Sequence, residues 1–225
     1  PDDECVIGAL PLRLLREGNV NVVNVAVTQG SRKDRQDARY EELVAACRFF
    51  GFGLVQVRRG GLEHIKLETR EAQPDLWGEC VERIAEIIAD HRPEILFLPH
   101  AEDWNGTHIG THHLVMDALT AIGPEFSCLL IETEYWQPMS NPNLMVECSS
   151  DLLADLIAGL TFHKGEVARN PYHLSLPAWM QDNVRRGSEV VGGQGGASAD
   201  FRFGTLYRAS HWRAGGAVLA SPESS

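Results

Sequence analysis

Two polar motifs in the chain carry the residue types that hydrolytic metal sites use. The first is Pro1-Asp2-Asp3-Glu4, and the second, about 100 residues later, runs from Asp103 to His108 and directly follows an apolar stretch. Two adjacent carboxylates can divide the work of hydrolysis, because one can hold a divalent cation while its neighbour accepts a proton from water. An imidazole from a separate loop would complete the ligands. Together the motifs predict a metal-activated hydrolytic site.

The carboxylates of the first motif have a second interpretation. Asp2 and Asp3 precede Glu4 and a segment, residues 5–16, whose pattern predicts a helix. Asp is a common helix N-cap, and acidic residues near a helix N-terminus are favoured by the helix dipole. A capping role does not exclude a ligand role, because a helix start also presents its backbone amides to an anion. Both interpretations stay open from the residues alone.

The second motif gathers several polar side chains at the end of a predicted strand. His108 and His112 stand one helical turn apart, as in helical zinc sites, although the Glu of the HExxH motif is missing. A packed or solvated role for His112 is the alternative. Asp103 could orient an imidazole through its second nitrogen, or it could shape the loop through an Asx turn. His100 closes the strand before the loop.

Arg39 and Glu42 form a third polar pair. They stand three residues apart near the start of a predicted helix and follow the loop Thr28-Gln29-Gly30-Ser31. An Arg at such a position could clamp a polar substrate. The alternative is an ordinary helical ion pair, which contributes only tenths of a kcal/mol.

Strand-like and helix-like segments alternate along most of the chain, which predicts an α/β protein. Apolar runs rich in β-branched residues predict strands, and apolar residues at helical spacing predict helices. The predicted strands cover residues 20–27, 54–57, 94–98 and 127–132, and the predicted helices 37–50, 76–90, 108–121 and 151–162. Such alternation implies a Rossmann-like, mostly parallel sheet with helices on both faces, in which ligands bind at the carboxyl ends of strands.

The last part of the chain has a different composition. Residues 170–225 are rich in Gly, Pro and aromatics, which predicts an irregular C-terminal extension with a partly helical segment at 172–187. We therefore expect a catalytic domain over residues 1–165 and an extension over residues 166–225. The extension is a candidate lid or subunit contact, so a homo-oligomer stays open.

Composition limits the partners. The formal net charge is −11 and the sequence pI is about 5.2, which argues against nucleic acid as the main partner, because nucleic acid rewards clustered Lys and Arg. No apolar run reaches the roughly 18 residues needed to span a bilayer. The five cysteines are widely spaced and never form a CxxC pair, which favours buried reduced thiols and a cytoplasmic protein. A small-molecule substrate fits these properties.

The order and spacing of the motifs resemble one family, the zinc-dependent de-N-acetylases related to N-acetylglucosaminyl-phosphatidylinositol deacetylase. That family's hallmark is His-Pro-Asp-Asp-Glu after the first strand, and Pro1-Asp2-Asp3-Glu4 is similar to all of it but the leading His. The resemblance covers roughly residues 1–165. Besides the motifs already described, it includes Glu134-Tyr135-Trp136, Pro142-Asn143 and His163-Lys164.

The resemblance implies a site with one zinc ion per chain. Asp3 and His108 would bind the zinc together with the family's leading His, whose place is before Pro1, and Asp2 would be the general base. Family members commonly have His-Pro-Asp-His where this chain has Asn105-Gly106-Thr107-His108. Asn105 therefore takes the place of a His linked to the oxyanion or the leaving group. Asn cannot deliver a proton, so Asp2, His112 or His100 are the alternatives for the general acid.

By that resemblance the chain is expected to remove an acetyl group from an N-acetylglucosamine-type conjugate. Arg39, Glu42 and His112 are the candidate substrate-binding residues. Two alternatives remain. The first is an amidase acting on another acylated small molecule, such as an antibiotic or a thiol-cofactor conjugate, and the second is a sugar-binding module without catalytic activity.

Overall fold

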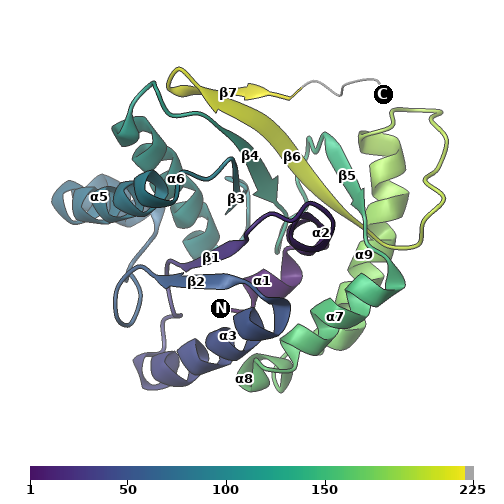
Figure 1. The fold of residues 1–225 in the computed structure, drawn as a ribbon, viewed down its shortest axis with the longest axis horizontal. Helices are drawn as coiled ribbons and strands as arrows, with labels where there is room; N and C mark the ends of the chain where they lie inside the picture. Colours follow the sequence, from purple (N-terminus) through teal and green to yellow (C-terminus); the bar gives the residue numbers. More distant parts are fainter. Residues whose placement is uncertain (221–225) are drawn as a thin grey trace. The chain divides into compact units, whose positions relative to one another are not determined.

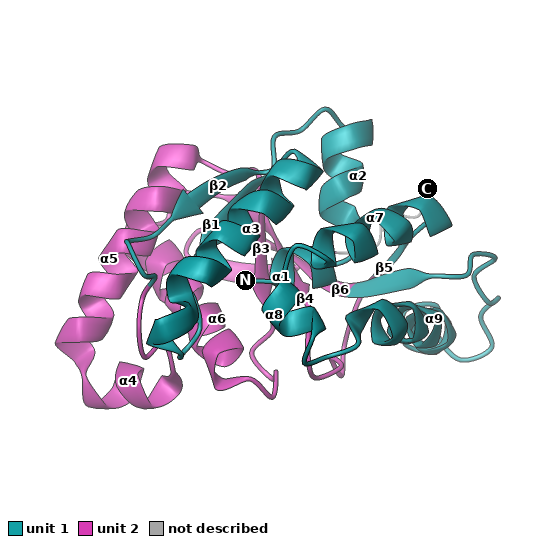
Figure 2. Cartoon of the chain, turned by 90° about the horizontal axis from the view of Figure 1, so that it is seen from below, with its two compact units in different colours: residues 1–61, 145–206 teal, residues 62–144, 207–225 magenta. Residues whose placement is uncertain are grey.

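The structure, a computed structural model, describes residues 1–220 and divides into two compact units (Figures 1 and 2). Unit 1 comprises residues 1–61 and 145–206, and unit 2 comprises residues 62–144 and 207–225. Each unit thus combines residues from both sides of position 165, where the sequence predicts the catalytic domain to end. That functional division stays a prediction, and the last five residues of the extension lie outside the described part.

Unit 1 joins the beginning of the chain to helices from its last third. Its elements are α1 (Asp3–Val6), α2 (Leu10–Glu17), β1 (Val23–Ala26), the 3₁₀ helix η1 (Lys33–Arg35), α3 (Gln36–Phe50), β2 (Gly53–Gln56), α7 (Ser150–Leu160), α8 (Lys164–Val167) and α9 (Tyr172–Val190). Strands β1 and β2 are parallel neighbours, and α3 connects them, which makes a βαβ unit (Figure 1).

A single hydrophobic core holds these segments together. Buried apolar residues from α2, α3, α7 and α9 belong to one cluster, so the two ends of unit 1 share their interior. The contact between α3 and α7 is close, because a Cβ added to Gly159 would lie 2.1 Å from the ring of Phe50. Burial of this kind, at roughly 25 cal/mol per Å² of apolar surface, is what fixes the short elements of the unit.

Unit 2 contains the second parallel strand pair. Its elements are α4 (Leu67–Ala72), α5 (Pro74–His91), β3 (Ile95–Pro99), α6 (Gly106–Ile122), β4 (Cys128–Thr133) and β7 (Gly216–Leu219), together with most of β6 (Gly204–Arg213). Strands β3 and β4 are parallel and joined by α6, while β6 is antiparallel to both β4 and β7. The order of this five-stranded sheet is β3-β4-β6-β5, with β7 beside β6 and with β5 at Leu144–Glu147.

The predicted α/β class is confirmed, and so are the strands and helices predicted between residues 20 and 162. One prediction needs correction. The expected helix over residues 5–16 is two helices, α1 and α2, because Gly8 has a φ of 94° and Pro11 stands in the first turn of α2. A left-handed residue commonly ends a helix, and Pro is well accommodated in the first turn of a new one.

The C-terminal third holds regular structure that the sequence does not reveal. The segment predicted to be partly helical lies in α9, and β6 and β7 follow it. Strand β6 buries polar Thr205 and Ser210, so its apolar pattern is interrupted. Asn143 supports this strand, because its side chain donates to the carbonyl of Ala209 at 2.9 Å and accepts from the N–H of Ala209 at 2.7 Å. The side-chain amide of Asn143 thus makes the two hydrogen bonds that the backbone of a neighbouring strand would otherwise make.

Two expectations from composition can be compared with the structure. All five cysteines lie within the described residues and are free and buried, as predicted. Among residues 1–220 no helix combines the length and the apolar character that a bilayer crossing requires.

Gly110 controls the approach of α6 to the segment before α4. A Cβ on Gly110 would lie 2.3 Å from the carbonyl oxygen of Ile65, which is rigid backbone. We predict that Gly110→Ala lowers the free energy of unfolding by about 1–3 kcal/mol through overpacking. Gly78 in α5 has open space around its Cα, so Gly78→Ala should raise that free energy by about 0.5–1 kcal/mol. Denaturant titration measures both, and a similar effect of the two variants would contradict the prediction.

Candidate active site

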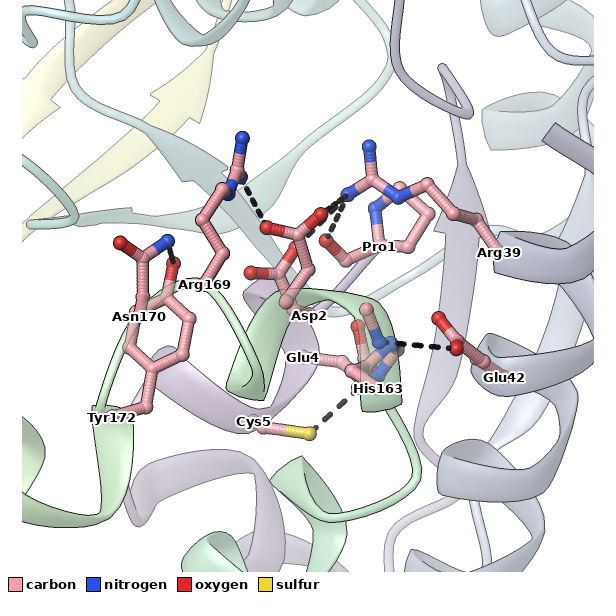
Figure 3. Close-up of polar contacts among 12 residues, drawn as sticks. Pro1, Asp2, Glu4, Cys5, Arg39, Glu42, His163, Arg169, Asn170 and Tyr172 are labelled. Atoms are coloured by element: carbon pink, nitrogen blue, oxygen red, sulfur yellow. Dashed lines mark hydrogen bonds and ion pairs between the residues drawn. The ribbon is translucent and has the colours of Figure 1, made fainter. Parts of the chain in front are cut away.

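The Asp2–Asp3 turn lies at the start of α1 in unit 1. Asp2 occupies the N-cap position of this helix, but its side chain makes no capping bond, and its φ is 82°. Its Oδ1 instead accepts a hydrogen bond from Nη2 of Arg39 at 3.3 Å, and the same nitrogen donates to the carbonyl of Pro1 at 3.2 Å (Figure 3). A left-handed conformation costs a non-glycine residue on the order of 1 kcal/mol, so surrounding contacts must hold it. Asp2 thus occupies the capping position that sequence allowed, but its side chain does not make the capping hydrogen bond.

The electrostatic setting of Asp2 is unusual for an aspartate. Burial, followed by the charge of neighbouring Asp3, raises the pKa of Asp2 to about 7, although Arg39 opposes this shift. Asp3 itself is half-buried. The two adjacent carboxylates therefore differ in their surroundings, as a division between ligand and proton acceptor requires.

Arg39 connects three segments of unit 1. It forms ion pairs with Asp2 at 3.3 Å and with Glu166 of α8 at 3.8 Å. A Cβ on Gly30 would lie 2.1 Å from its Nη1, so the arginine lies against the loop after β1 only because residue 30 is glycine. No ion pair joins Arg39 to Glu42 within the described chain. The helical pair that spacing permitted is therefore not formed, and Arg39 faces the carboxylate turn.

Glu42 and Arg39 each retain an unsatisfied polar atom. Oε1 of Glu42 accepts a long hydrogen bond from the N–H of Gly165 at 3.4 Å (Figure 3). Oε2 of Glu42 and Nε of Arg39 are buried and have no hydrogen-bond partner among the described residues. A buried polar atom without a partner costs about 1–3 kcal/mol, and a bound ligand would recover this cost. A substrate-binding role for Arg39 and Glu42 stays a prediction.

Asp103 is the centre of the second motif, in unit 2. Its carboxylate is buried, accepts hydrogen bonds from the N–H of Asn105 at 2.7 Å and of Trp136 at 3.0 Å, and lies 3.4 Å from Nδ1 of His108. Burial alone would raise the pKa of Asp103, but the contact with His108 and the hydrogen bonds from the two backbone groups lower it. The orienting role and the Asx turn, which sequence presented as alternatives, are both present.

His108 is held from two sides. Asp103 lies against its Nδ1, and the ring of Tyr135 packs against the imidazole with 4.8 Å between the centroids. A carboxylate against one ring nitrogen is a common way of fixing an imidazole's orientation. A metal-binding role for His108 stays a prediction.

Asn105 and His112 both have structural contacts. Asn105 is the N-cap of α6, and its Oδ1 accepts from the N–H of Thr107 at 2.9 Å. Nδ1 of His112 lies 2.9 Å from the carbonyl oxygen of Pro99 and 3.5 Å from Glu132. These contacts are of the packing kind that sequence allowed for His112. A catalytic role for Asn105 and substrate contact by His112 stay predictions.

Sequence reasoning missed a group of residues from α8 and its surroundings. Nε2 of His163 lies 2.5 Å from Oε1 of Glu4 (Figure 3). Glu166 is buried and forms ion pairs with Arg39 and Arg169. Burial, followed by the charge of Asp2, raises the pKa of Tyr172 well above its usual range. The sequence singled out only the pair His163-Lys164, through the resemblance to the de-N-acetylase family. No local pattern marks the others.

Among the described residues, Glu4, Cys5 and His163 of unit 1 have ligand atoms that all lie within 4.8 Å of one another, close enough for one metal ion. The expected zinc ligands Asp3 and His108 stay a prediction. Burial, and then the charge of Glu4, raises the pKa of the Cys5 thiol, which disfavours the thiolate that zinc prefers.

The chain is similar in fold to solved structures of low sequence identity. N,N'-diacetylchitobiose deacetylase from Pyrococcus horikoshii is 17% identical, with a TM-score of 0.62 and coverage of 95% of this chain and 81% of that one. The zinc-inhibited form of teicoplanin deacetylase Orf2 is 13% identical, with a TM-score of 0.65 and coverage of 100% and 97%. GalB, the 4-carboxy-2-hydroxymuconate hydratase from Pseudomonas putida KT2440, is 14% identical, with a TM-score of 0.64 and coverage of 92% of each chain.

Sequence comparison adds the family. No curated protein matches the chain. The family described as PIG-L, GlcNAc-PI de-N-acetylase, matches residues 1–119, which is more than half of the 225 residues and includes every candidate site residue named above from the two motifs and α3. The resemblance seen in the motifs is thereby confirmed, and the chain belongs to the PIG-L family of GlcNAc-PI de-N-acetylases.

Proposed function

We propose that the protein is a zinc-dependent hydrolase that removes the acetyl group from an N-acetylglucosamine-type conjugate. The observation that carries the proposal is the family match over residues 1–119, because that range contains both motifs and the Arg39–Glu42 pair. Fold similarity alone would not suffice, since one fold hosts several chemistries and the neighbours include a hydratase as well as deacetylases.

The side chains have distinct roles in the proposed reaction. Asp3 and His108 would hold the zinc ion, which when bound would supply Lewis acidity toward the acetyl carbonyl and toward water. Asp2 accepts a proton from the attacking water and later returns it to the nitrogen. The amide C–N bond breaks, and acetate and a free amine are released. Asp103 keeps His108 in one orientation throughout.

Arg39 and Glu42 support a sugar as substrate. Nε of Arg39 is a buried donor and Oε2 of Glu42 is a buried acceptor, and both have no partner within residues 1–220. A hydroxyl group both donates and accepts, so neighbouring hydroxyls of one sugar ring would satisfy both atoms. A purely apolar acyl compound would leave them unsatisfied. This pairing favours an amino sugar over other acylated molecules.

The metal and the substrate each have an alternative. One structural neighbour is described as a zinc-inhibited deacetylase, so zinc has to be compared with other divalent ions. An acylated antibiotic remains the alternative substrate, because a neighbour is a teicoplanin deacetylase. A cytoplasmic location, the absence of a nucleic-acid partner and a homo-oligomeric state stay predictions from composition.

Amine release from N-acetylglucosamine conjugates tests the reaction. The full-length protein should release amine with zinc, cobalt or manganese, lose this activity in a chelator, and regain it when metal returns. Asp2→Asn keeps the shape of the side chain but removes the proton acceptor, so kcat should fall about 100-fold or more. Asp34→Asn is the control, because Asp34 is exposed and pairs only with Arg32.

Activity that survives the chelator, or full turnover by Asp2→Asn, would contradict the proposal. Substrate binding without amine release at saturating zinc would instead identify a sugar-binding module. A panel of acyl groups and aglycones separates a sugar deacetylase from a general amidase.

Asn105 allows a test that separates capping from catalysis. Asn105→Ser keeps an oxygen for the N–H of Thr107 but removes the side-chain amide donor, whereas Asn105→Ala removes both. If the amide donor stabilises the oxyanion, both variants lose about 100-fold in kcat, and only the Ala variant also loses about 1 kcal/mol of stability. Normal turnover in the Ser variant would remove Asn105 from the mechanism.

A further inference from the structure

We propose that the buried hydrogen bond between His163 and Glu4 fixes the position of the Asp2–Asp3 turn, which makes His163 a positioning residue for the hydrolytic site. The catalytic part of this inference rests on the proposed function. The structural part, that His163 holds α1 in place, can be tested without it.

The contact joins residues 159 positions apart in the chain. His163 is the N-cap residue of α8 and is 0% exposed, while Glu4 lies in α1 and is 6% exposed. Nε2 of His163 and Oε1 of Glu4 are 2.5 Å apart (Figure 3). Nδ1 of His163 is buried and has no partner in the described chain, so the proton that joins the pair belongs on Nε2.

Helix α1 cannot fix its own geometry. It has four residues, whereas isolated helices shorter than about 12 residues are marginal in water, and its N-cap side chain makes no capping bond. Asp2 moreover adopts a left-handed conformation. The turn must therefore be held by tertiary contacts, namely Arg39 on Asp2, the buried side chain of Cys5, and His163 on Glu4.

Of the contacts that hold the Asp2–Asp3 turn, the one from His163 matters most, because it partners the buried charge of Glu4. A buried carboxylate that loses its partner costs about 3–5 kcal/mol. The other donor to Glu4 is the thiol of Cys5 at 3.5 Å, which is a weak donor. Without His163, the response of lowest free energy is for the Glu4 side chain to turn toward water. Glu4 is bonded directly to Asp3, so the carboxylate turn would move with it.

A metal ion at Glu4, Cys5 and His163 is the competing interpretation. Zinc binds oxygen and nitrogen at about 2.0–2.1 Å in tetrahedral geometry, which places two such ligands about 3.3 Å apart. Nε2 of His163 and Oε1 of Glu4 are in direct contact at 2.5 Å, which is closer than two ligands of one ion would stand. The geometry therefore favours a positioning pair.

Two amide substitutions at His163 test whether the hydrogen bond from its Nε2 to Glu4 holds α1 in place. In His163→Gln the amide nitrogen takes roughly the place of Nε2, and in His163→Asn it takes roughly the place of Nδ1, which faces no partner. The Gln variant should keep the bond to Glu4, and the Asn variant should lose it. His173→Asn is the matched control, because His173 is an exposed histidine of α9.

Hydrogen exchange of the α1 amides is the first readout. The N–H groups of Cys5 and Ile7 bond to the carbonyls of Asp2 and Asp3 at 3.0 and 2.9 Å. We expect at least about 10-fold faster exchange of these amides in His163→Asn, with α7 and α9 little changed and the Gln variant close to wild type. Unchanged exchange in the Asn variant would overturn the inference. If the Asn variant does not fold, faster exchange of the α1 amides in the Gln variant would overturn the inference.

Kinetics and metal content are the second readout. The Asn variant should lose about 10- to 100-fold in kcat with KM within twofold of wild type. The Gln variant should keep most of the wild-type kcat. Loss of one metal ion per chain in the Gln variant would identify a metal site and overturn the positioning role. A wild-type protein without amine release would refute the proposed function alone, because the exchange comparison still decides how α1 is held.

Discussion

Buried carboxylates that must be partnered are the constraint on which the candidate site depends. Asp2, Glu4 and Glu166 are all buried in unit 1, and a carboxylate taken out of water costs several kcal/mol unless it is paired. Their partners come from distant segments, with Arg39 from α3 and His163 from the turn before α8. The pairs Asp2–Arg39 and Glu4–His163 thus join the first residues of the chain to later segments, and the pair Arg39–Glu166 joins α3 to α8.

The same principle organises the loop of unit 2. Asp103 gathers two backbone N–H groups and the imidazole of His108, so one carboxylate fixes an irregular loop, the start of α6 and a candidate metal ligand. Glu132 plays a comparable part, because Arg208 of β6 donates two hydrogen bonds of 2.6 Å to it and His112 lies beside it. Rigid loops are what a site needs when its residues do not lie on regular elements.

The fold is shared with solved structures that are less than 20% identical to this chain. Apolar core positions tolerate exchange among residues of similar size, so a fold can persist at such identity. The neighbours include deacetylases and a hydratase, so this framework hosts more than one chemistry. Membership of the deacetylase family therefore rests on the motifs in residues 1–119 and not on the fold.

Sequence by itself determined the α/β class, the four strands and four helices predicted between residues 20 and 162, and the order of the motifs, because apolar periodicity and short motifs are local signals. The short elements η1, α4 and β5 were not predicted. Sequence also singled out Asp2, Asp3, Asn105 and His108 as candidate site residues, a choice that stays a prediction. Their roles are not decided by spacing. It also pointed to Arg39 and Glu42, although it left a helical ion pair open.

Only the tertiary structure decided which groups are partners. It broke the expected first helix at Gly8, showed β6 with its buried polar positions, and brought His163 to Glu4 across 159 residues. It also showed that Asp103 forms the Asx turn and orients His108 at once. The physical reason is that a hydrogen bond or an ion pair depends on distance in space, and burial fixes that distance only after the whole chain has packed.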